Sequence, residues 1–197
     1  MNDSAPANFE AAALQASEAP DSFLAKTQRL AQQFAPYELS DIMAMMISAS
    51  FYNMDEEQFA RVLPYGQRFR AAPMPSVPAR FSVSQACFQN CTYFTKHGTD
   101  SQLLYCEGWA LASMLPVLHA WVSPKPNVAW DPTWQANMRQ PVEEGEYWGF
   151  AFRPGRLPEL LENTGCYGIF DSPGASNLVM ANPAHWLVHP KSEGGRA

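Results

Sequence analysis

The sequence has little charge and no concentration of positive charge. Of its 197 residues, 16% are Asp, Glu, Lys or Arg, and the formal net charge is −6. The basic residues are scattered, and the densest pair is Arg68 and Arg70. Because binding to a nucleic-acid backbone requires a basic stripe or patch, the composition argues against nucleic acid as a partner.

The chain also lacks a long apolar run and a secretory leader. Its longest apolar segment, SDIMAMMISASF, covers residues 40–51 and falls short of the roughly 20 residues that a membrane-spanning helix needs. The N-terminal segment has no basic region followed by an apolar core. We therefore expect a cytoplasmic protein that has no membrane partner.

Cysteine is scarce, and its spacing includes no CxxC motif. The cysteines are Cys87, Cys91, Cys106 and Cys166. We expect free thiols rather than a disulfide framework, and neither a metal ion nor another cofactor. A zinc site built from Cys87, Cys91, Cys106 and a histidine is the alternative, although the usual second knuckle of a zinc site is missing.

What the chain does have is enough apolar sequence for a substantial core, 47% of all residues. We expect residues 1–20, rich in Ala, Ser and Pro, to be disordered and residues 21–197 to form a single domain. Within that domain, helical patterns cover 21–65, a proline-rich linker covers 70–81, and a helix followed by strands covers 82–190. This order predicts an α+β fold.

One segment, LHAWVSPKPNVAWDPTW at residues 118–134, places a histidine and an aspartate on either side of a turn. Its two apolar ends favour strands, and the prolines and asparagine between them favour a turn. In a regular hairpin centred near Lys125, His119 and Asp131 are cross-strand neighbours on one face. A carboxylate beside an imidazole fixes the tautomer of the ring and supports its charged form.

Cys87 is the nucleophile that would complete this pair. It lies in a predicted helix over 82–98, and with Ser84 as the N-cap it occupies about the third helical position. Free N–H groups in the first turn of a helix favour a thiolate, which is the form a cysteine acyl-transfer enzyme needs. The alternative is that Cys87 and Cys91 are both small buried apolar residues.

The motifs ACFQNC, LLYCEGWA, HAWV, VAWDPTW and YWGFAF, within residues 85–152, resemble those of a poorly characterised group of bacterial and phage proteins. That group is similar to the transglutaminase-like branch of the papain-like cysteine fold. The resemblance implies a helix bearing Cys87 packed on an antiparallel sheet bearing His119 and Asp131, with helices N-terminal to this core. It also implies that Cys87 is the nucleophile, His119 the base and Asp131 the residue that orients the base. The pattern usually has alanine where this chain has Cys91.

Three further residues are assigned to the substrate or to accessory roles. By the resemblance, Asn90 and Glu107 match positions that accompany the triad. Glu107 is interpreted either as a solvated strand residue or as part of the site, since the neighbouring Gly108 would let substrate or backbone approach. Trp121 belongs to a group of tryptophans that we expect to be mostly core, with one or two lining the substrate cleft.

We therefore expect a cysteine-dependent enzyme that hydrolyses or transfers an acyl group. Its substrate would be a peptide, a protein or another amide, ester or thioester. The alternative is a non-catalytic protein of phage type on the same fold, which binds or inhibits a host factor and uses its N-terminal helices for docking. Fast alkylation of Cys87 near neutral pH would favour the enzyme.

Overall fold

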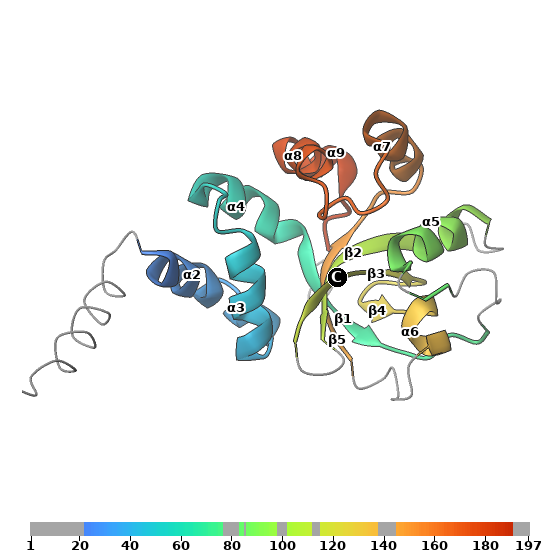
Figure 1. Cartoon of the computed structure of the whole chain (residues 1–197), viewed down its shortest axis with the longest axis horizontal. Helices are drawn as coiled ribbons and strands as arrows, with labels where there is room; N and C mark the ends of the chain where they lie inside the picture. Colours follow the sequence, from blue (N-terminus) through green and yellow to red (C-terminus); the bar gives the residue numbers. More distant parts are fainter. Residues whose placement is uncertain are drawn as a thin grey trace, which may run out of the picture. The chain divides into compact units, whose positions relative to one another are not determined.

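The computed structural model describes residues 22–76, 83–84, 86–97, 102–111, 115–137 and 145–190. Helices and one curled sheet make it an α+β protein, as the sequence predicts (Figure 1). The chain divides into two compact units, Met1–Asp55 and Glu56–Ala197. The prediction of a single domain over 21–197 stays a prediction, and the expected disorder of 1–20 falls outside the described residues.

The described part of the first unit consists of α2 (Phe23–Gln32), the short 3-10 helix η1 (Ala35–Tyr37) and α3 (Asp41–Ser50). Ser22 caps α2, because its Oγ accepts a hydrogen bond of 3.1 Å from the backbone N–H of Ala25. The chain beyond α3 returns to α2, where Lys26 Nζ donates to the carbonyl oxygen of Met54 at 3.0 Å. The helical pattern in this part of the sequence is confirmed.

The second unit begins with α4 (Glu56–Val62) and the 3-10 helix η2 (Leu63–Tyr65), which lead directly into strand β1 (Gly66–Ala71). The linker predicted over 70–81 was therefore wrong at its start, since Arg70 and Ala71 belong to β1. The strand has only a short alternation, in which Arg68 and Arg70 are exposed and Phe69 and Ala71 are buried. Residues 77–81 of the linker lie outside the described part of the chain.

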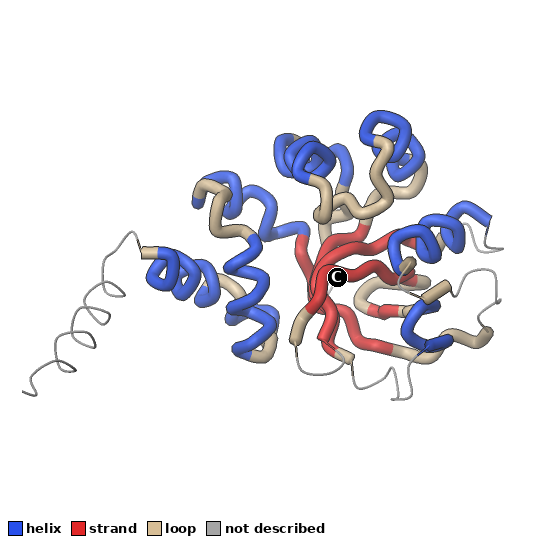
Figure 2. The backbone as a smooth tube through the Cα atoms, in the orientation of Figure 1, coloured by secondary structure: helices blue, strands red, loops and turns tan. Residues whose placement is uncertain are grey.

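Five strands form the sheet of this unit, in the order β3-β2-β5-β1-β4 (Figure 2). β2 (Leu104–Leu111), β3 (Val117–Ser123) and β5 (Glu146–Ala151) run antiparallel to their neighbours, and β5 is also antiparallel to β1. The prediction of a wholly antiparallel sheet was wrong, because β1 lies between β5 and β4 (Val128–Ala129) and runs parallel to β4.

The sheet curls until its two end strands meet. Val122 of β3 and Trp130, directly after β4, form an isolated antiparallel bridge that joins them. All five strands contribute side chains to one core cluster on the inner side: Phe69, Ala71, Cys106, Ala110, Trp121, Ala129, Tyr147 and Ala151. This enclosed layer of apolar side chains fixes the register of the strands, because a shift by one residue would turn each core side chain outward.

Helices α5 (Cys87–His97) and α6 (Pro132–Asn137) contact each other, and α5 also contacts β2 and β3. Helices α7 (Arg156–Thr164), α8 (Pro173–Ala181) and α9 (Pro183–Trp186) follow the last strand and lie together in Figure 1. On the outer side of the sheet, the ring of Phe170 lies against that of Phe150, with centroids 5.0 Å apart. Within the described ranges, no helix is both long and apolar enough to cross a membrane.

Candidate active site

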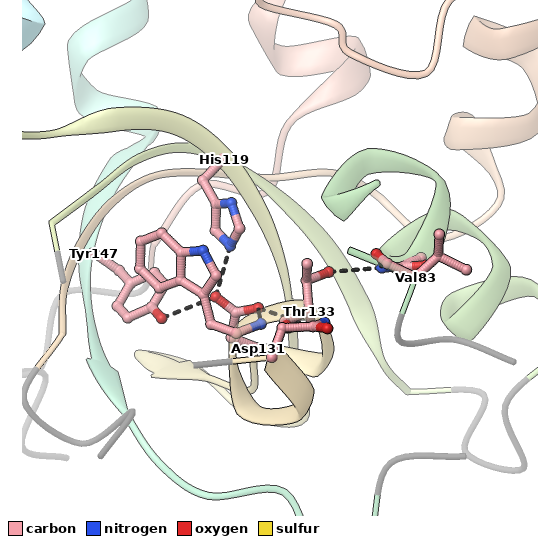
Figure 3. Close-up of polar contacts among 8 residues, drawn as sticks. Val83, His119, Asp131, Thr133 and Tyr147 are labelled. Atoms are coloured by element: carbon pink, nitrogen blue, oxygen red, sulfur yellow. Dashed lines mark hydrogen bonds and ion pairs between the residues drawn. The ribbon is translucent and has the colours of Figure 1, made fainter. Parts of the chain in front are cut away.

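The predicted hairpin exists, and it brings His119 and Asp131 together. Val122 and Trp130 exchange backbone hydrogen bonds of 2.9 and 2.8 Å. Strand pairing ends there, so Asp131 begins the turn into α6 instead of facing His119 across the ladder. The two side chains nevertheless meet, with His119 Nε2 at 2.6 Å from Asp131 Oδ2 (Figure 3).

Asp131 is held by its own helix and by the sheet. Its Oδ1 accepts hydrogen bonds from the backbone N–H groups of Thr133 at 3.1 Å and Trp134 at 2.9 Å, which makes it the N-cap of α6. Its Oδ2 accepts a further bond of 3.0 Å from the Tyr147 hydroxyl of β5 (Figure 3). Asp131 is fully buried. These bonds fix the carboxylate at the position where His119 meets it.

His119 is enclosed between this carboxylate, an aromatic ring and Cys87. The indole of Trp134 stacks on the imidazole with ring centroids 4.2 Å apart. Burial lowers the pKa of His119, but the charge and hydrogen bond of Asp131 and the hydrogen bond with Cys87 outweigh it and raise the pKa from 6.5 to about 9. The ring is therefore an imidazolium at neutral pH. Because Asp131 occupies Nε2, Nδ1 is the nitrogen left for the thiol.

Cys87 is the first residue of α5, so the cap predicted at Ser84 was wrong. Ser84 lies in a turn, in which the N–H of Ala86 bonds to the carbonyl oxygen of Val83 at 3.3 Å. The helical bonds begin with Asn90 N–H to Ala86 O at 2.8 Å. The N–H groups in the first turn of a helix have no partner within it, and Cys87 lies in that turn of α5.

Asn90 joins the helix that carries Cys87 to the helix that Asp131 caps. Its Nδ2 donates to Thr133 Oγ1 at 2.8 Å and to the carbonyl oxygen of Val83 at 2.7 Å (Figure 3). With only 2% of its surface exposed, it has little access to a substrate. Its hydrogen bond to Thr133 ties α5, which begins at Cys87, to the first turn of α6, which Asp131 caps.

Cys91, the other cysteine of α5, is fully buried. Burial, followed by the negative charge of Asp131, raises the pKa of its thiol well above 9.0. Cys106, in the core cluster, is raised well above 9.0 by burial alone. Both side chains therefore stay protonated at neutral pH.

Glu107 does not join the triad. Gly108 faces His119 across the β2–β3 ladder, so the side chain of Glu107 leaves the opposite face of the sheet. There it is fully buried and accepts hydrogen bonds from Tyr105 Oη at 2.7 Å, Ile169 N–H at 3.0 Å and Phe170 N–H at 2.6 Å. Burial raises its pKa from 4.5 to about 7, against the opposing effect of these hydrogen bonds.

Trp121 lies in the core of the curled sheet and is fully buried. Its ring makes edge contacts with Phe69 and Tyr147, at centroid distances of 5.1 and 5.2 Å. Among the described residues, its indole N–H has no hydrogen-bond partner. The expectation that it contacts substrate stays a prediction, whereas Trp134 is the tryptophan that covers His119.

Sequence reasoning did not assign roles to Trp134 and Tyr147. For Trp134 a local signal existed. If Asp131 is the N-cap of a helix, the residue three positions later donates its N–H to the Asp131 side chain, which places Trp134 close to that carboxylate. For Tyr147 no local signal existed. Its contact with Asp131 depends on the pairing of β5 with β1 and β2, in which Tyr147 lies opposite Phe69 and Ala110.

No three His, Cys, Asp or Glu side chains within the described ranges are grouped so that they could hold a metal ion. The cysteines of the zinc alternative form no such group there. In comparisons with known proteins, no family model, curated protein or solved structure matches the chain.

Proposed function

We propose that the protein is a cysteine-dependent acyl-transfer enzyme on a papain-like, transglutaminase-like core. The observation that carries the proposal is His119, buried between Asp131 and Cys87 with its pKa raised to about 9. A cysteine and an imidazolium side by side are the nucleophile and the proton donor that acyl transfer requires. Trp134 stacks on the imidazole of His119, and Asp131, fixed as the N-cap of α6, binds its Nε2. Together they hold the imidazole in one position for repeated proton transfer.

In the first half of the reaction, the thiolate of Cys87 attacks the carbonyl carbon of an amide, ester or thioester. A C–S bond forms, and the carbonyl electron pair moves to oxygen, where the backbone N–H of Cys87 and a neighbouring donor stabilise the oxyanion. When the tetrahedral species collapses, the bond to the leaving group breaks and His119 donates its proton to that group. The product is an acyl-enzyme and a neutral imidazole.

In the second half, water or an amine attacks the acyl-enzyme. His119, now neutral, takes the proton of the attacking group, and collapse of the second tetrahedral species breaks the C–S bond. The thiolate and the imidazolium are restored. Water gives a carboxylic acid and makes the protein a hydrolase, whereas an amine gives a new amide and makes it a transferase. Asp131 stays bound to His119 Nε2 throughout and supports its charge.

A second candidate function is that of a binding or inhibitory protein that keeps the triad without using it. The observation that favours it is the low exposure of the two reacting side chains, 8% for Cys87 and 4% for His119. A nucleophile that substrate reaches only with difficulty is compatible with a fold retained for binding a host factor. The two candidates differ in whether Cys87 forms an acyl-enzyme.

The test is direct detection of that intermediate. The full chain is incubated with activated acyl donors (an aryl ester, an alkyl thioester and a glutamine peptide), quenched in acid, and mapped by mass spectrometry. We expect an acyl adduct on Cys87 in the wild type and in Cys91→Ala, the matched control, and none in Cys87→Ala. Iodoacetamide labelling of Cys87 without any acyl adduct, in a chain with unchanged circular dichroism, would favour the binding protein.

A further inference from the structure

A pocket lies between the C-terminal half of α5 and the N-terminal half of α7. Its volume is about 220 Å³, and it lies over Tyr105 of β2 and Phe152 at the end of β5. Leu103, Leu157 and Leu161 add apolar surface to its lining. Cys87, His119 and Asp131 are not among the residues that line it. The size is at the small end of ligand sites and leaves room for about ten non-hydrogen atoms.

The charges around the pocket are of one sign. Lys96 and Arg153 are exposed and line it, and none of its lining residues is acidic, in a chain whose formal net charge is −6. Arg153 Nε donates to the carbonyl oxygen of Ala184 at 2.9 Å, which ties the guanidinium to α9. Gly155, also in the lining, precedes α7 without a side-chain cap, so the positive end of that helix adds to the field.

We propose that this pocket binds a small carboxylate with an apolar body. The carboxylate meets Lys96 and Arg153, and the body lies on Phe152 and Leu157. The ligand is either a free short-chain acid or the carboxyl end of a peptide that finishes in an apolar residue. The inference does not depend on the proposed acyl-transfer activity, because no atom of the triad takes part.

The experiment titrates the full chain, as Cys87→Ala, with four probes and follows backbone amide signals by NMR. The probes are hexanoate, its amide, N-acetylleucine and N-acetylleucinamide. We expect saturable shifts at Gly155 and Leu161 with the acids, and binding of each amide to be at least about tenfold weaker because the charge is gone. Preference for hexanoate identifies a free acid, and preference for N-acetylleucine identifies a peptide end.

Two substitutions test the contact with Lys96. Lys96→Gln should weaken binding about two- to fivefold, and Lys125→Gln, in the β3–β4 turn outside the pocket, should not.

Three results would overturn the proposal. They are the absence of saturable shifts with both acids, equal binding of acids and amides, and shifts that centre on the Trp134 indole and are unchanged by Lys96→Gln. The last result would assign the acids to the triad as reaction products. Since the chain carries Cys87→Ala in every titration, failure of the acyl-transfer proposal leaves these outcomes unchanged.

Discussion

The second unit buries two carboxylates on opposite faces of one curled sheet, and their partners give them different tasks. Asp131 faces His119, a side chain that carries a positive charge, in addition to three neutral donors. Glu107 faces neutral donors, Tyr105 Oη and the N–H groups of Ile169 and Phe170. Both are fully buried. The two carboxylates therefore differ in the charge of their partners: Asp131 is paired with a positively charged imidazole, and Glu107 binds the backbone at Ile169 and Phe170.

Glu107 and Tyr105 can hold the loop at residues 167–170 whether Glu107 is ionised or protonated. Tyr105 Oη lies within 2.7 Å of Glu107 Oε2 and within 3.2 Å of the carbonyl oxygen of Tyr167. When Glu107 is ionised, the hydroxyl donates to the carboxylate. When Glu107 is protonated, its own O–H can donate to Tyr105, and the hydroxyl then turns to Tyr167. With a pKa of about 7, both arrangements are populated near neutral pH.

The largest effect is expected from removing the Glu107 carboxyl group. Glu107→Ala leaves two backbone N–H groups and the Tyr105 hydroxyl without their buried acceptor, and it opens a cavity under the loop. We expect a loss of about 3 kcal/mol or more in the free energy of unfolding, measured by urea denaturation. Glu159→Ala, on the exposed side of α7, is the control and should change stability little. Equal stability of the two variants would mean that the loop is held by its aromatic contacts alone.

The two sites should also differ in how stability depends on pH. Folding raises the pKa of Glu107 from 4.5 to about 7, so the folded chain binds the proton more tightly and loses stability as pH rises through that window. Folding raises the pKa of His119 from 6.5 to about 9, so its contribution is complete below 6.5 and is lost as pH rises toward 9. Both titrations therefore lower the stability as pH rises, Glu107 in the lower pH range and His119 in the higher.

Glu107→Gln should remove the loss of stability between about pH 4.5 and 7 and leave the loss at higher pH that comes from His119. The wild-type minus variant difference in unfolding free energy should change by something on the order of 2 kcal/mol between pH 4.5 and pH 7 and then stay level. The measurement is urea denaturation at closely spaced pH values, in which the other titrating groups cancel in the difference. A difference that is flat across the acidic window would show that Glu107 titrates as it does in the unfolded chain.

The next effect is smaller. The rate at which Cys87 is alkylated should depend on the Asp131 carboxylate about tenfold and very little on that of Glu107. Asp131→Asn removes the charge that supports the imidazolium of His119. The rate of iodoacetamide labelling at Cys87 should then fall about tenfold at roughly pH 6–7, where an ordinary thiol is mostly protonated. Glu107→Gln should change that rate less than about twofold. A wild-type rate that follows a free cysteine, unmoved by Asp131→Asn, would reduce the triad to a coincidence of spacing.

The parts of this arrangement that sequence could predict are those with local signals. Helices α2 and α3 follow from the helical pattern of apolar residues, and the turn between His119 and Asp131 follows from its prolines and asparagine. The start of α5 was misplaced because Ser84 is a good cap residue by type, while the chain uses it in a turn. Strand β1, the parallel pairing of β4 and the outward direction of Glu107 depend on long-range register, which no single segment encodes.

The last and smallest effect concerns the Tyr147 hydroxyl, which donates to the same Asp131 oxygen that holds His119. Burial, then the negative charge of Asp131, raises the pKa of Tyr147, so the phenol remains a neutral donor. Tyr147→Phe keeps the ring and its edge contact with Trp121 but leaves Asp131 Oδ2 bonded to His119 alone. We expect a stability loss of about 1 kcal/mol, the size of one hydrogen bond, and a change below about threefold in Cys87 labelling. The imidazole should bind its proton slightly more tightly, since the carboxylate no longer shares its charge with the phenol, and NMR titration of the His119 ring would register that upward shift. A downward shift, as Asp131→Asn should give, would mean that Tyr147 acts by holding Asp131 in position rather than by sharing its charge.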